Sequence, residues 1–106
     1  MNKTYIKGFL EDIVLHLIRE NGESYGYELT RMVEERTKGV ININEGALYP
    51  VLHKLEQRGV LESSFKTVAN RPRKYYRLAT KHVKALSESE AEARSYVAAL
   101  NSIFNI

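Results

Sequence analysis

The chain has 106 residues, a formal net charge of +3 and no cysteine. The length fits one small domain, and the lack of cysteine excludes disulfides, thiolate nucleophiles and Cys-ligated zinc, which is typical of a reducing cytoplasm. No apolar run approaches the roughly 18 residues that span a bilayer. Acidic residues also interrupt the apolar segment near the N-terminus, so we expect neither a membrane segment nor a signal peptide.

The positive charge is concentrated in one segment. Residues 66–84 contain seven Lys or Arg and no acid, whereas the remaining chain has nine bases against thirteen acids. Such segregation creates a local positive field suited to a polyanion, although basic runs on protein surfaces are more often plain solvated faces.

Two helices are predicted in the first 38 residues. Apolar side chains recur at helical spacing over residues 5–18, and their wide arc predicts a helix covered on more than one face, by the rest of the domain or by a second copy. A second helix is predicted over residues 25–38, with a core face made of Leu29, Met32 and Val33. Gly26 near its start weakens the helix, which is tolerated where a neighbouring backbone must come close.

Residues 44–59 carry the signals of a helix with one exposed face. They follow a β-rich tetrapeptide, residues 40–43, that is long enough for one edge strand at most. Asn44 is suited to cap the N-terminus of this helix, and Gly59 is suited to end it in a left-handed conformation. Its apolar stripe consists of Leu48, Val51, Leu52 and Leu55. Pro50 lacks the amide hydrogen that would bond a carbonyl of the first turn, so the helix should be bent or loosened there.

The next segment predicts a β-hairpin with a basic end. Residues 60–68 and 73–78 are rich in β-branched and aromatic side chains, and the turn-prone residues 69–72 join them. Because successive residues of a strand face opposite sides, one of Tyr75 and Tyr76 should pack inward and the other outward.

A last helix is predicted from Thr80 to about Ile106, and a capping box at residues 87–90 leaves open a break at Ser87. Its apolar stripe extends beyond what a three-helix core can cover, so we expect a second subunit to cover it. Together with two aromatic residues of the first helix, the candidate dimer interface comprises Tyr5, Phe9, Ala93, Tyr96, Val97, Leu100, Ile103 and Phe104.

The order helix, helix, short strand, helix, strand, basic tip, strand, long helix predicts a winged helix-turn-helix, a mostly α fold with a small β-hairpin (α+β). Residues 1–79 would form a DNA-binding domain and residues 80–106 a dimerisation helix. In this fold the third helix lies in the major groove while the hairpin crosses the backbone. The candidate DNA-binding residues are Asn44, Gly46, Ala47, Tyr49, Pro50, His53, Lys54, Lys66, Arg71, Arg73, Lys74 and Arg77. Taken alone, residues 44–59 could equally be an ordinary amphipathic core helix.

No pattern of an enzyme or of a metal site is found in the sequence. His16, His53 and His82 fall on different predicted elements without metal-ligand spacing. A Gly-rich phosphate loop and an activated serine arrangement are also missing. We therefore expect no catalysis, no metal and no cofactor.

Three segments resemble the PadR family of bacterial transcriptional regulators: residues 26–29 (GYEL), residues 44–56 (NEGALYPVLHKLE) and residues 71–78 (RPRKYYRL). The resemblance implies a winged helix-turn-helix dimer that acts on DNA, usually as a repressor, with its C-terminal helix contacting the partner subunit. Some members of the family release DNA on binding phenolic acids or flat aromatic drugs, which makes a small aromatic effector a further candidate partner. Ala79 and His82 depart from the Thr and Gly that the family tends to have here, so the entry to the last helix is expected to differ.

The leading hypothesis is therefore a homodimeric, sequence-specific DNA-binding regulator of the cytoplasm, with repression as the expected mode. One alternative is a winged-helix module that binds another protein through its apolar C-terminal face and does not read DNA. A second alternative is a small-molecule sensor whose dimer cavity contains Tyr5, Phe9, Tyr96 and Phe104.

Overall fold

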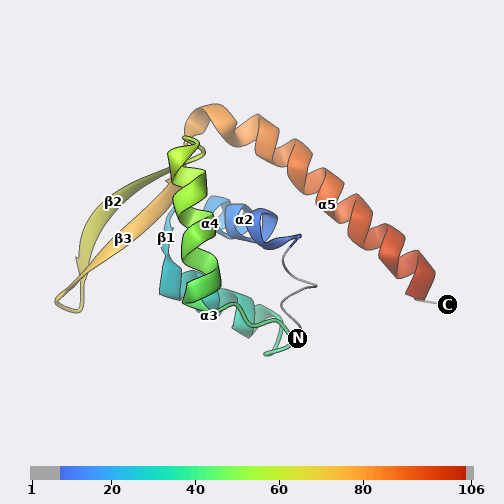
Figure 1. The fold of residues 1–106 in the computed structure, drawn as a ribbon, viewed down its shortest axis with the longest axis horizontal. Helices are drawn as coiled ribbons and strands as arrows, with labels where there is room; N and C mark the ends of the chain where they lie inside the picture. The colour runs from blue at the N-terminus through green and yellow to red at the C-terminus, as the bar shows by residue number, and fades with distance from the viewer. Residues whose placement is uncertain (1–7, 105–106) are drawn as a thin grey trace.

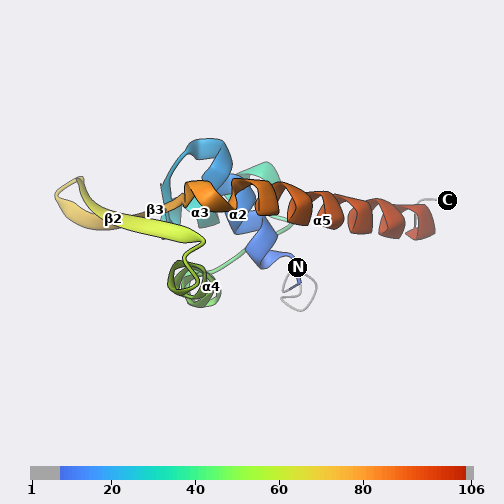
Figure 2. The ribbon, with the colours of Figure 1, turned by 90° about the horizontal axis from the view of Figure 1, so that it is seen from above.

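The computed structural model describes residues 8–104, except for the side chains of residues 82–85 and 87. Its elements, in chain order, are α2 (Leu10–Asn21), β1 (Ser24–Tyr25), α3 (Gly26–Arg36), α4 (Glu45–Gln57), β2 (Leu61–Val68), β3 (Arg71–Leu78), a 3-10 turn (Thr80–His82) and α5 (Val83–Phe104). Helices α2, α3 and α4 gather near the base of the sheet, and the β2–β3 hairpin and α5 extend from there to opposite sides (Figure 1, Figure 2). The molecule is therefore elongated, with extents of 51 × 31 × 20 Å.

One hydrophobic core joins the three shorter helices to the sheet. Its most deeply buried apolar side chains are Val14, Ile18, Leu29, Leu48, Leu52, Leu55 and Leu61. Burying each such side chain stabilises the fold by about 1.5–3 kcal/mol. The predicted core face of α3 is confirmed, since Leu29 and Val33 are buried and Met32 packs against the same cluster. The predicted stripe of α4 is confirmed in the same way, with Val51 at its edge.

Helix α4 begins and ends at the predicted signals. Asn44 Oδ1 accepts a hydrogen bond from the amide of Ala47 at 2.8 Å, which satisfies one free donor of the first turn. At the other end Gly59 has a φ of +76°. The amide of Val60 donates a hydrogen bond to the carbonyl of Leu55 at 2.9 Å, as in a Schellman motif. The helix continues unbroken through Pro50.

The hairpin turn is tighter than predicted. Ala69 and Asn70 alone form it, with φ values of +52° and +64°. Two successive left-handed residues suit the right-handed twist of the flanking strands. Arg71 and Pro72 therefore belong to β3 and not to a four-residue tip. The prediction for the tyrosine pair is confirmed on the inward side, because Tyr76 is buried, whereas Tyr75 is only half-buried.

The third strand is not residues 40–43, as predicted, but β1, which pairs with the middle of β3. Residues 40–43 form a loop in which the Thr37 hydroxyl accepts from the amide of Ile41 at 3.0 Å and lies 3.2 Å from its carbonyl oxygen. The amide and carbonyl of Ile41 are therefore not free to pair with a neighbouring strand, so residues 40–43 form a loop despite their β-propensity. Because Tyr25 is extended in β1, α3 begins one residue later than predicted, at Gly26.

Helix α5 enters through the 3-10 turn and then runs continuously to Phe104, so the alternative of a break at Ser87 is wrong. The predicted start of the first helix lies outside the described residues, within which α2 begins at Leu10. None of the described helices is both long enough and apolar enough to cross a membrane.

Candidate nucleic-acid interface

One side of α4 is buried in the core and the other side is open. Leu48, Leu52 and Leu55 point inward. Of the α4 residues predicted to contact DNA, Ala47 is half-buried, and those that are exposed are Asn44, Gly46, Tyr49, Pro50, His53 and Lys54. Figure 2 views α4 nearly along its axis, with no other element covering its lower side. Apart from Ala47, the predicted residues of this helix therefore share a solvent-exposed surface.

Tyr49 connects this open side to α3. A Cβ atom on Gly26 would lie only 3.0–3.2 Å from the phenol end of Tyr49, so the missing side chain makes room for the ring. The close approach that Gly26 permits is thus made by a side chain, whereas a neighbouring backbone was predicted. Burial of the ring and the nearby carboxylate of Glu45 raise the pKa of the Tyr49 hydroxyl.

Three of the five basic residues predicted to contact DNA from the hairpin are paired with acids. Lys66 forms an ion pair with Glu23 and lies 5.0 Å from the centre of the Tyr75 ring. Arg77 Nε lies 3.6 Å from Glu62 Oε1 on the neighbouring strand. The third pair, Lys74 Nζ and Glu56 Oε1 at 2.8 Å, joins β3 to the end of α4. Pairing compensates the positive charge of all three side chains.

The two arginines nearest the turn are different. Within the described part of the chain, neither Arg71 nor Arg73 forms an ion pair with an acid. The Arg73 guanidinium lies 5.3 Å from the centre of the Tyr25 ring, which holds it by a cation–π interaction. Among residues 8–104, its buried Nε has no hydrogen-bond partner. The uncompensated positive charge of the hairpin therefore lies near its tip.

Sequence reasoning did not identify the supporting residues of this surface. Tyr25 packs edge-on against Tyr75, with ring centres 5.1 Å apart, and also carries Arg73. Glu23 and Glu56 neutralise bases that follow them by 43 and 18 positions. Local periodicity contains no signal for such distant pairs.

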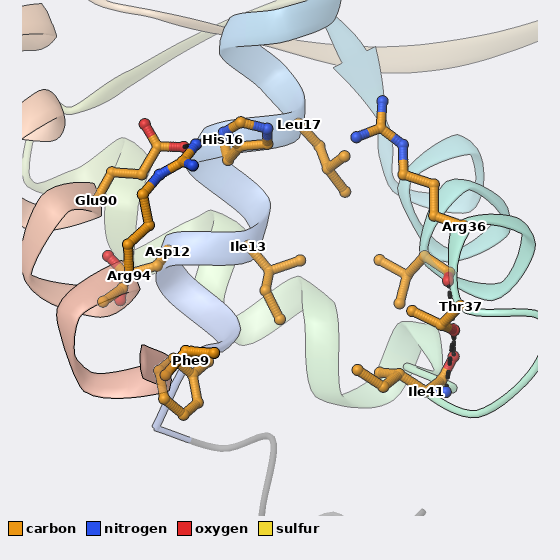
Figure 3. Close-up of a pocket in the computed structure, with 13 residues that line it drawn as sticks. Phe9, Asp12, Ile13, His16, Leu17, Arg36, Thr37, Ile41, Glu90 and Arg94 are labelled. Atoms are coloured by element: carbon orange, nitrogen blue, oxygen red, sulfur yellow. Dashed lines mark hydrogen bonds and ion pairs between the residues drawn. The ribbon is translucent and has the colours of Figure 1, made fainter. Parts of the chain in front are cut away.

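A groove of about 420 Å³ lies between α5 and the body of the domain (Figure 3). Its floor is apolar, and its lining includes Phe9, Ile13, Val33, Ile41, Ala93 and Val97. The rings of Phe9 and Tyr96 are 5.9 Å apart. Of the predicted dimer-interface residues, Tyr5 lies outside the described range, Ala93 and Leu100 are half-buried, and Tyr96, Val97, Ile103 and Phe104 are 52–77% exposed.

A polar cluster holds α5 to α2 beside this groove. Glu90 of α5 accepts hydrogen bonds from His16 and Arg19 of α2. Ser89, which precedes Glu90 on α5, donates a hydrogen bond from its hydroxyl to Asp12 of α2 at 2.8 Å. Burial alone would raise the pKa of Glu90, but the bonds from Arg19 and His16 outweigh it and hold the pKa below the usual value. Among the described side chains, no three His, Asp or Glu come together as metal ligands.

An open third helix next to a two-stranded hairpin, both on a small helical core, defines the winged helix-turn-helix class of proteins. The model of the transcriptional regulator PadR-like family matches residues 14–88. The chain therefore belongs to the PadR-like family of transcriptional regulators, a family without enzymatic activity, and membership implies DNA binding.

Similar proteins and solved structures cover most of the chain. An uncharacterized protein of Lysinibacillus sphaericus is 38% identical over 84 residues, which cover 78% of this chain and 76% of the relative. A PadR family transcriptional regulator from Eggerthella lenta is 30% identical, with a TM-score of 0.76 and coverage of 94% and 85%. A transcriptional regulator from Clostridium thermocellum is 26% identical, with a TM-score of 0.81 and coverage of 98% of both chains.

Proposed function

We propose that the protein is a homodimeric, sequence-specific DNA-binding repressor. The observation that carries this proposal is the open side of α4 next to a hairpin with two arginines near its tip, neither of which is paired with an acid of the described part of the chain. A helix of this kind fits the major groove, where base edges present a distinct donor and acceptor pattern. The wing then adds sequence-independent contacts to phosphates. Repression rests on the resemblance to the family, and a role on DNA assigns the protein to the cytoplasm.

We assign base-edge and nearby phosphate contacts to the open side of α4. His53 and Lys54 lie one turn or more beyond the capped N-terminus, and Tyr49 offers a hydroxyl from the same side. Arg71 and Arg73 are the proposed contacts of the wing, because arginine is favoured both at phosphates and in a narrow minor groove. Lys66 and Arg77 are each paired with an acid, so we assign them a smaller contribution to DNA binding.

The proposed dimer uses α5. This helix carries an apolar stripe in which Tyr96 is 60% and Phe104 is 77% exposed, and such side chains on a monomer are a large apolar surface in water. A second copy of the chain, with the same stripe, is a self-complementary partner. Two α4 helices would then read half-sites about 10 bp apart or a multiple of that spacing.

A small aromatic effector is proposed to act at the same α5 surface. The groove volume of about 420 Å³ falls within the range of about 300–1,000 Å³ that is typical of ligand pockets. A planar compound that enters between Phe9 and α5 would change how α5 sits on the body, and through the dimer it would change the spacing of the two α4 helices.

The experiment is a selection of bound duplexes from a random pool at physiological salt, followed by anisotropy with the recovered site and with mixed-sequence DNA. We expect an enriched pseudo-palindrome that binds at least about 10³-fold more tightly than mixed DNA. A pool that remains random after repeated rounds would refute sequence-specific binding and favour the protein-interaction alternative.

A further inference from the structure

Glu56, in the last turn of α4, bridges this helix to both strands of the wing. Its carboxylate accepts hydrogen bonds from Lys74 Nζ on β3, at 2.8 Å, and from the Ser63 hydroxyl on β2. The side chains of Glu56 and Lys74 are 29% and 35% exposed, so salt screens this pair less than it would a pair on the open surface. Of the ion pairs described for the wing, this is the one whose acid lies on α4.

Lys74 is held on a second side by an aromatic ring. Its Nζ lies 5.4 Å from the centre of the Tyr76 ring, and Tyr76 is only 4% exposed. In the ladder Ser63 stands opposite Tyr76, two pairs closer to the core than Lys74, which stands opposite Phe65. The ammonium group is therefore fixed between a carboxylate and a ring face at the point where the hairpin leaves the core.

Both members of the pair are charged at neutral pH. The bond from Lys74, and then that from Ser63, lowers the pKa of Glu56. The bond to Glu56 in turn raises the pKa of Lys74. Two shifts of opposite direction with the same cause describe a formed ion pair, in which the charge of Lys74 is compensated.

We propose that Glu56 is a positioning residue, which sets the direction of the wing relative to α4 and keeps Lys74 away from DNA phosphates. This inference rests on the DNA-binding function proposed above. It assigns Lys74 to the link between the two DNA-reading elements and leaves the phosphate contacts near the tip to Arg71 and Arg73. The distance between base contacts and wing contacts is then fixed by one carboxylate.

Glu56→Gln tests the inference with little change in volume. The amide can still accept from Ser63 but no longer carries the charge that holds Lys74. Glu62→Gln is the matched control, because it makes the same charge change on the hairpin. The partner of Glu62 is Arg77 on the adjacent strand, so this control removes no contact between α4 and the wing.

The first readout is the slope of log K for DNA binding against log salt concentration. In otherwise wild-type protein Lys74→Ala should leave the slope unchanged, because no phosphate contact is lost. In the Glu56→Gln protein Lys74 is released, and adding Lys74→Ala should then reduce the slope by about 0.9, the value for one phosphate. A reduction of that size by Lys74→Ala alone would overturn the proposal.

The second readout is specificity. Glu56→Gln should lower the ratio of affinities for the selected site and for mixed-sequence duplex by about tenfold, the scale of one lost base contact. Glu62→Gln should leave this ratio unchanged, because a general change in charge acts on all sequences alike. An unchanged ratio in Glu56→Gln would contradict the positioning role.

A wild-type protein without any sequence preference would refute the proposed function and not the link between Glu56 and Lys74. Urea midpoints decide the link independently of DNA. The urea midpoint is measured for Glu56→Gln, for Lys74→Ala and for the double variant. A shift in the double variant that is smaller than the sum of the two single shifts supports the link, because the two residues then share one interaction. Strictly additive shifts would overturn it.

Discussion

At the scale of single residues, Gly26 and Tyr49 depend on each other across two helices. A Cβ on Gly26 would lie 3.0–3.2 Å from the phenol end of Tyr49, and Tyr49 as a residue is 46% exposed. Since Tyr49 lies on the open side of α4, the same ring belongs both to the packing of α3 and to the candidate DNA interface.

Gly26→Ala tests this dependence. Alanine favours a helix over glycine by up to about 1 kcal/mol, but here the added methyl must displace the ring, so stability should hardly change. In a Tyr49→Ala background the space is free, and the same substitution should raise the urea midpoint. Equal effects of Gly26→Ala in both backgrounds would show that the ring is not the reason for the glycine.

Arg71→Ala tests the charge near the wing tip. It should weaken binding to all sequences and reduce the salt slope by about 0.9, because one phosphate contact is lost. Lys66→Ala, measured under the same conditions, should change the slope less, since Glu23 already compensates Lys66. An Arg71→Ala protein with the wild-type slope would remove this residue from the interface.

At the scale of elements, α5 is held by a small number of polar contacts from α2. The Glu90 carboxylate accepts hydrogen bonds from His16 and Arg19, and its side chain is 17% exposed. Beyond this cluster α5 extends away from the body (Figure 1). The contacts of Glu90 are therefore among those that attach the proposed dimerisation helix to the domain.

The stability of this attachment should depend on pH. The pKa of Glu90 in the folded protein is below its ordinary value of 4.5. A depressed carboxylate contributes stability above pH 4.5 and loses that contribution as the pH falls through the folded pKa. Thermal midpoints measured from pH 7 down to pH 3 should therefore fall less steeply for Glu90→Gln than for the wild type. Identical slopes would show that Glu90 makes no such contribution.

At the scale of the whole molecule, the two extensions from the core have different surfaces. The wing is basic, whereas the distal part of α5 exposes Val97, Ile103 and Phe104. The molecule is 51 Å long, and the described residues of its small core leave these apolar side chains of α5 uncovered. A second copy that buries this area would also place a second α4 in the assembly.

Phe104→Asp should convert the proposed dimer to a folded monomer, because a charge buried in an apolar interface lacks a partner. Sedimentation measures the oligomeric state, and circular dichroism confirms that the domain remains folded. Ser102→Asp is the control, since Ser102 lies on the polar side of α5, where its hydroxyl donates to the carbonyl of Ala99. A Phe104→Asp protein that sediments as a dimer would exclude this end of α5 from the interface.

The sequence by itself determined the elements whose causes are local. Helix periodicity, the Asn44 cap, the glycine at the end of α4 and the alternation of Tyr75 with Tyr76 each involve neighbours a few residues apart, and all were predicted correctly. The winged helix-turn-helix fold follows from the order of these elements. The predicted strand at residues 40–43 was wrong, because a β-rich composition does not reveal that the Thr37 hydroxyl accepts a hydrogen bond from the amide of Ile41.

Only the tertiary structure decided which charges are available and what completes the sheet. Lys66, Lys74 and Arg77 look alike in sequence to Arg71, but acids of other segments compensate the first three. The third strand is two residues long, too short to have a period of its own. For Lys66, Lys74 and the third strand the deciding contact joins residues of different parts of the chain, so it exists only after the domain has packed and brought the partners together. Glu62 and Arg77 stand opposite each other in the hairpin ladder, so the register of the two strands decides that pair.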